Sequence, residues 1–386
     1  MKKELCIITI IITLLFSISG YSTTLPPDET FTSVANYLAR SQIIFDGGTI
    51  GICGCYANEF NYNGPIIAGL LQAYEITDNI AYKEAAERAA NFTILMYGPN
   101  FLGDEAYGIA KLGKETGNQV YVDVIRDFYN NLDTYKYIHG YNDTTPEKAT
   151  FYLSFHAVAS LMVDANDAGI WRQSILEYLP QVGDDLSYFP VMTLGIATWA
   201  LAQTGPMDDT LIDPFLSKGV PYWEDVTLHD LPELLASHQV LTGEHKGAFY
   251  VRFDHTSPGI GYYTSGYTED TIFGLMGLIS SNNYRTDYYG EIGLVDSSDE
   301  VGLYDHLSTD SNDPNRVWDF DEEIQNAREV LAESVQNAND DNFNNISIGE
   351  VFDHIWQGKY TYYFFGGELL ETFDNEYVYP SNPAKE

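Results

Sequence analysis

An internal repeat of 39 residues is the feature of this sequence that most restricts its fold. Each of its two clearest units contains an apolar segment, a polar turn and a second, amphipathic segment, which is the pattern of a helical hairpin. Repeats of this length are typical of stacked hairpins, none of which can bury its apolar face alone. The equivalent pairs are Gly69 and Gly108, Thr77 and Thr116, Asn79 and Asn118, and Tyr82 and Tyr121.

A glycine recurs inside the first helix of the predicted hairpins, at Gly69, Gly108, Gly195 and Gly274. Glycine costs ~1 kcal/mol relative to alanine inside a helix, so its recurrence favours close contact between helix backbones. Apolar, small-residue helices that alternate with amphipathic ones predict two concentric layers. We therefore predict an all-α chain that forms an α/α toroid of about six helical hairpins. Gly- and Ala-rich helices form its inner ring and amphipathic helices its outer ring. A straight solenoid is the alternative, because the repeat alone does not require closure.

The toroid is predicted to form a single domain that follows an export signal. Lys2 and Lys3 precede an apolar run that ends near Phe16, as in a secretory signal peptide. The last helical pattern lies at about 362–374. The predicted organisation is a signal peptide (1–22), a disordered lead (23–29), the α/α-toroid domain (30–375) and a C-terminal tail (376–386).

The charge of the chain restricts its partners. Lys and Arg number 19 against 56 Asp and Glu, which gives a formal net charge of −37. A surface this negative repels phosphate backbones, so we expect no nucleic-acid partner. It also argues against a polyanionic substrate unless metal ions mediate the contact. No segment after the signal peptide is long and apolar enough to predict a stable membrane span. We expect a secreted, periplasmic or cell-surface protein.

Two stretches resemble known toroid proteins. The stretch NGPIIAGLLQAYEITDNIAYKEAAERAANF resembles the hairpin units of six-hairpin glycosidases, and GYTEDTIFGLMGLI is similar to inner-helix starts in terpenoid-cyclase and prenyltransferase toroids. The resemblance covers most of residues 60–281. It implies an α/α toroid and activity on carbohydrate. The DxDD and repeated QxxxGxW motifs of terpenoid cyclases are missing from the sequence.

Aromatic and acidic residues gather just before the predicted inner helices. All inner helices of a toroid begin at the same end, so these segments should converge on one rim. Aromatic rings stack on the C–H faces of sugars, and carboxylates accept hydrogen bonds from hydroxyls. The alternative is that the rings only pack loops onto the toroid. The residues expected to bind a carbohydrate are Tyr62, Phe101, Tyr188, Arg252, Tyr262, Tyr263 and Tyr267.

Asp104 and Asp270 hold equivalent places, each four residues before an inner-helix glycine, and are flanked by Glu105 and Glu269. Two carboxyl groups that face each other across the rim could supply the acid and the base of glycoside hydrolysis. Acids in the first turn of a helix are also stabilised by the helix dipole, so capping is the alternative role of these four residues.

The densest cluster of ionisable residues is Arg252, Asp254 and His255. Arg252 could form an ion pair or bind a substrate carboxylate. His255 could be a general base oriented by Asp254. With Tyr262 or Tyr263 as the acid, this cluster would suit a β-eliminating polysaccharide lyase.

Other polar residues have structural alternatives. His156 lies in an apolar inner-helix pattern and is predicted to be a satisfied core histidine. Cys53 and Cys55 could form a strained disulfide, half of a metal site or a pair of packed thiols. Residues 296–323 are rich in Asp and could bind calcium or form a solvated loop. No other cofactor and no specific metal ligand is predicted.

The sequence thus predicts an exported, glycan-active protein, with glycoside hydrolysis by paired carboxylates at the toroid mouth as the first hypothesis. The alternatives are a non-catalytic extracellular glycan-binding or scaffold protein and a polysaccharide lyase.

Overall fold

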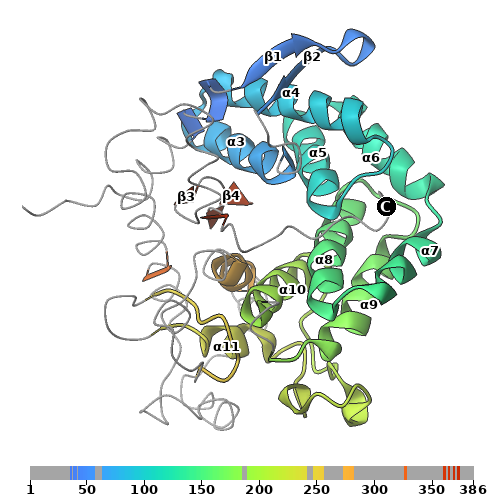
Figure 1. Cartoon of the computed structure of the whole chain (residues 1–386), viewed down its shortest axis with the longest axis vertical. Helices are drawn as coiled ribbons and strands as arrows, with labels where there is room; N and C mark the ends of the chain where they lie inside the picture. Colours follow the sequence, from blue (N-terminus) through green and yellow to red (C-terminus); the bar gives the residue numbers. More distant parts are fainter. Residues whose placement is uncertain are drawn as a thin grey trace, which may run out of the picture.

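The computed structural model is mainly helical and contains little sheet (Figure 1). The structure describes residues 35–56 (without 37 and 41), 63–184, 189–240, 247–255, 273–281 and 326–327, and the backbone of four short strands between 360 and 373. The helical class predicted from the sequence is confirmed. The signal peptide, the lead, the tail and the Asp-rich stretch lie outside the described residues.

Successive helices pair as hairpins, and the first helices of the hairpins also pack on one another. α3 pairs with α4, α5 with α6, and α8 with α9, while α3 contacts α5, α5 contacts α8, and α8 contacts α10. In Figure 1 these first helices follow a curved row, with α4, α6, α7 and α9 on its outer side. The helices are α3 (Asn63–Thr77), α4 (Ile80–Tyr97), α5 (Gly103–Thr116), α6 (Gln119–Asn131), α7 (Thr134–His139), α8 (Pro146–Met162), α9 (Ala168–Tyr178), α10 (Pro190–Thr204) and α11 (Leu231–Ala236).

The repeat seen in the sequence is reproduced in the hydrogen bonds of the turns. The hydroxyls of Thr77 and Thr116 each donate to the carbonyl oxygen four residues earlier, at 2.6 Å. The side chains of Asn79 and Asn118 each accept from the backbone N–H two residues later, at 3.2 Å. These bonds cap α4 and α6. Equivalent residues therefore end and restart the helices in both units.

Glycines allow the inner helices to touch through their backbones. A Cβ atom on Gly108 would overlap the backbone of Gly64 in α3, and one on Gly195 would lie 2.5 Å from the carbonyl group of Phe273. The close helix contact predicted from the recurring glycines is confirmed at these two positions. Gly274 instead faces the ring of Phe249.

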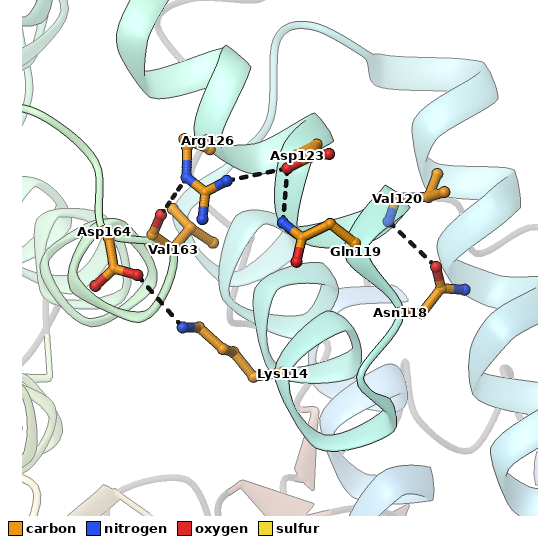
Figure 2. A network of polar contacts seen from close by, with 8 residues as sticks. All are labelled: Lys114, Asn118, Gln119, Val120, Asp123, Arg126, Val163 and Asp164. Atoms are coloured by element: carbon orange, nitrogen blue, oxygen red, sulfur yellow. Dashed lines mark hydrogen bonds and ion pairs between the residues drawn. The ribbon is translucent and has the colours of Figure 1, made fainter.

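Arginines of the outer helices bind backbone carbonyls at or just beyond the ends of the next inner helices, and Figure 2 shows this for Arg126. Arg126 of α6 donates through Nε to the carbonyl of Val163, just after α8, at 2.7 Å, and through Nη1 to Asp123 at 3.0 Å. Arg172 of α9 makes the equivalent bond to the carbonyl of Pro206, after α10, at 2.8 Å. Carbonyls at a helix end lack partners within the helix, and the arginines supply them. Because each arginine belongs to the preceding outer helix, these bonds also join neighbouring hairpins.

We expect Arg126→Ala to lower the free energy of unfolding by about 1 to 2 kcal/mol, because a charge-assisted hydrogen bond to a helix end is lost. Lys114→Ala is the matched control. The Lys114 ammonium lies 3.6 Å from the carboxylate of Asp164 on an exposed surface, where ion pairs contribute roughly 0–1 kcal/mol. Urea denaturation of both variants measures the difference. Equal losses would contradict the role given to Arg126.

Two regions contain strands that the sequence reading did not predict. β1 (Ile43–Asp46) and β2 (Ile52–Cys55) form an antiparallel hairpin against α4. The predicted helix at about 362–374 was wrong, because β3 (Tyr360–Thr361) to β6 (Thr372–Phe373) lie there. Within this region β4 (Phe364–Phe365) pairs with β5 (Glu368–Leu369) across two positions that are both glycine, a sequence that favours a tight hairpin turn.

The inner helices face one another through buried aromatic rings. Trp199 of α10 packs against Tyr107 of α5 at 5.2 Å and against Phe155 of α8 at 5.4 Å, measured between ring centroids. Phe151 of α8 packs against Phe273 at 5.3 Å. Among the described residues, none of the helices is both long and apolar enough to cross a membrane.

Candidate functional site

A cluster of ionisable and aromatic side chains lies at the N-terminal end of α10. The backbone N–H of Val191, in the first turn of α10, donates to the carbonyl of Val251 at 3.3 Å, which places residues 251–255 beside this helix end. The N–H of Tyr250 donates to the carbonyl of His238 at 2.9 Å. These two backbone contacts bring His238 and His255 together.

Three side chains of the cluster form a hydrogen-bonded chain. His238 Nδ1 lies 2.6 Å from His255 Nε2, and His238 Nε2 lies 2.7 Å from the hydroxyl of Tyr222. His238 is 3 % exposed. Burial, reinforced by His255, holds the pKa of His238 well below its usual value. A neutral imidazole has one donor and one acceptor nitrogen, so His238 can pass a proton between Tyr222 and His255.

Tyr222 and His255 form the two ends of this chain, and both side chains are partly exposed. Burial raises the pKa of Tyr222 well above its usual value. The His255 ring stacks on Tyr250 at 4.4 Å with an interplanar angle of 17°. Its backbone has a φ of 52°, a region that is unfavourable for residues with a Cβ and that recurs at functional sites. His255 is thus held in place and accessible at once.

Arg252 is held by two carboxylates next to the histidines. Its Nη2 atom lies 2.8 Å from Asp184 Oδ2 and 3.2 Å from Asp254 Oδ2. Asp184 also accepts from the backbone N–H of Phe253 at 2.8 Å. The ion pair considered as an alternative for Arg252 is therefore present. Two carboxylates, those of Asp184 and Asp254, therefore face the single positive charge of Arg252.

Asp104 and Glu105 lie fully buried in the first turn of α5. Glu105 Oε2 accepts from the backbone N–H of Leu102 at 2.7 Å, which is a capping contact. Phe101 is also buried, and its ring packs against Phe128 at 5.4 Å. The structure therefore shows a capping role for Glu105 and a packing role for Phe101. Catalysis by Asp104 and Glu105 stays a prediction.

Several predicted site residues cannot be placed relative to this cluster. They lie outside the described residues, so the proposed pairing of Asp104 with Asp270 stays a prediction as well. These residues are Tyr62, Tyr188, Tyr262, Tyr263, Tyr267, Glu269 and Asp270.

His156 is the satisfied core histidine that the sequence predicts. Its Nδ1 lies 3.0 Å from the Tyr129 hydroxyl and its Nε2 lies 3.1 Å from the Tyr137 hydroxyl. The ring also packs against Trp171 at 4.7 Å. Burial lowers the pKa of His156 to about 3, so the ring is neutral and both nitrogens are satisfied.

Sequence reasoning missed the contribution of Tyr222 and His238. Asp184 lies 68 positions from its partner Arg252, too far along the chain for a local pattern to pair them. Tyr222 and His238 lie in segments without repeat character, so no periodicity singled them out. The available signal was that His238 precedes His255 by only 17 positions.

The chain matches no protein-family model, no curated protein and no solved structure in the comparisons made. Across the part of the chain that the structure describes, no group of three or more His, Cys, Asp or Glu side chains is placed to hold a metal ion. The stretch considered for calcium, residues 296–323, lies outside that part.

Proposed function

We propose that this protein is an exported α/α toroid that hydrolyses a neutral glycan at the rim where its inner helices begin. The curved row of α3, α5, α8 and α10, with its outer layer of helices, supports the ring over the straight solenoid (Figure 1). The net charge of −37 favours a neutral substrate over a polyanionic one.

The chain from Tyr222 through His238 to His255 is the observation that carries this proposal. His255 is the general base and removes a proton from a water molecule, whose oxygen then bonds to the anomeric carbon. The glycosidic C–O bond breaks, and the leaving oxygen takes a proton from a rim carboxylic acid. Asp270 is the first candidate for that acid and Asp104 the second. His238 and Tyr222 are positioning residues that orient His255 and stabilise its charged form.

A polysaccharide lyase is the second candidate, because an imidazole next to tyrosines also suits β-elimination. His255 would then remove the proton next to the carboxylate of a uronate, the electron pair would form a C=C bond, and the neighbouring C–O bond would break. The excess of carboxylates around Arg252 disfavours a uronate at this position. Binding without turnover is the third candidate. The buried rings of Tyr107 and Trp199 pack against each other between the inner helices, which favours a filled centre over an open catalytic pocket.

A screen of the purified protein on neutral and uronate-containing polysaccharides, with and without calcium, tests the proposal. Hydrolysis yields new reducing ends that incorporate oxygen from labelled water, whereas elimination yields an unsaturated product that absorbs ultraviolet light. We expect labelled reducing ends from a neutral glycan. Unsaturated products would establish the lyase instead, and binding without either product would establish the scaffold.

His255→Asn is expected to lower turnover at least about 100-fold, because the general base is lost. Asparagine tolerates a positive φ better than most residues, so the backbone should keep its shape and the melting temperature should change little. His139→Asn, at the end of α7, is the matched control and should retain turnover. Full activity of His255→Asn would remove this residue from the mechanism.

A further inference from the structure

β2 carries two free cysteines on one face. Cys53 and Cys55 are separated by one residue of an antiparallel strand, so their side chains point the same way. Both are buried in a small apolar cluster with Phe92 of α4, apart from the main core, and Ile50 packs against that cluster. Two sulfur atoms thus share one enclosed, water-poor space.

The strand itself opposes a disulfide between these thiols. Alternate residues of an antiparallel strand lie about 6.8 Å apart, and their Cβ atoms are nearly parallel. A disulfide needs Cβ atoms about 3.5–4.5 Å apart. β2 is paired with β1 at both positions, Cys53 opposite Phe45 and Cys55 opposite Ile43. Closing the disulfide would therefore break the pairing of the hairpin.

The same spacing suits a metal ion between the two sulfurs. Two metal–sulfur bonds of about 2.3 Å in line span about 4.6 Å, and the thiols would reach this span by rotating toward each other, with Cys53 Sγ giving up its 3.7 Å contact with the Gly51 carbonyl. Thiolates select soft ions such as Cu(I) and Zn²⁺. Structural zinc takes four ligands, and no third His, Cys, Asp or Glu ligand joins the pair among the described residues. Cu(I) accepts two sulfur ligands in a linear arrangement.

We propose that Cys53 and Cys55 form a two-sulfur binding site for a soft univalent metal ion, represented by Cu(I). One Cu(I) ion displaces the two thiol protons and forms two Cu–S bonds, so a complex with a net charge of −1 and two free protons result. No electron is transferred.

Anaerobic titration of the reduced full-length chain with Cu(I), against a chromophoric Cu(I) chelator, tests this site. We expect one tightly bound Cu(I) per chain, the release of two protons, and two sulfur neighbours in the X-ray absorption spectrum. Cys53→Ala and Cys55→Ala should each abolish this binding. Ile52→Ala changes an exposed side chain of the same strand and is the matched control, which should bind one ion as before.

Three results would overturn the proposal. They are no uptake by the reduced wild-type chain, undiminished uptake by either alanine variant, and a Cys53–Cys55 disulfide in the isolated protein by mass spectrometry. Circular dichroism of each variant shows whether it folds. If a variant is unfolded, the number of sulfur neighbours in the wild-type spectrum decides, because any number other than two contradicts the site.

Discussion

Acidification from about pH 7 to about pH 3 is expected to remove about 4 kcal/mol from the free energy of unfolding through His156 alone. The pKa of this histidine is lowered from 6.5 to about 3 in the folded chain because the ring is fully buried. The unfolded chain therefore binds a proton more readily than the folded one. The stability that His156 contributes is complete above about pH 6.5, falls as the pH drops below that value, and is lost near pH 3.

Urea denaturation at a series of pH values measures this effect. His156→Phe should be less stable at neutral pH by about 1–3 kcal/mol, since the Tyr129 hydroxyl loses the ring nitrogen that it binds at 3.0 Å. The Tyr137 hydroxyl loses its ring partner at 3.1 Å but still donates to the Phe101 carbonyl at 3.2 Å. Its stability should then depend less on pH than that of the wild type. His139→Gln, outside this network, should keep the wild-type slope. A His156→Phe slope equal to the wild-type slope would contradict the account.

The hairpins could be predicted because their signals are local. Thr77 and Asn79 lie within a few residues of the groups they bind, and the same contacts recur at Thr116 and Asn118. The apolar surroundings of His156 likewise follow from its place in an inner helix. Such features depend on helix periodicity and capping, which a single sequence reveals.

The histidine chain could not be predicted, because it depends on where the repeat fails. The segment after α10 is not a second helix of the hairpin type, and prolines at 206, 214 and 221 oppose a continuous helix there. The 3₁₀ turn Pro221–Trp223 within this segment carries Tyr222 to the N-terminal end of α10. The ring of Tyr222 stacks on Phe253 at 3.7 Å. Departures from a regular pattern are where functional residues are expected.

The short strands show a second limit of pattern reading. β1 and β2 are four residues each, too short for alternation to stand out against the glycines around them. Their pairing is stabilised by contact with α4, and an isolated two-stranded hairpin is marginal in water. Tertiary contact therefore decides this element, and its sequence alone does not.

Gly195→Ala is expected to lower the free energy of unfolding by about 3 kcal/mol. Alanine favours a helix by ~1 kcal/mol over glycine, but its Cβ would lie 2.5 Å from the carbonyl carbon and oxygen of Phe273. These are backbone atoms, which cannot rotate away, so α10 and the helical residues 273–281 must separate. Overpacking of this kind costs about 1–3 kcal/mol and sometimes more. Loss of contact at Gly277, which faces the Gly195 carbonyl, adds to it.

Gly169→Ala provides the matched control, because the same substitution in α9 meets no atom within 4 Å. It should raise the free energy of unfolding by about 0.5–1 kcal/mol, since only the helix preference of alanine acts there. Urea denaturation of the two variants should therefore give changes of opposite sign. If both substitutions stabilise the chain, the inner helices do not pack through their glycines. The proposed ring, and with it the proposed rim site at His255, would then lose its main structural support.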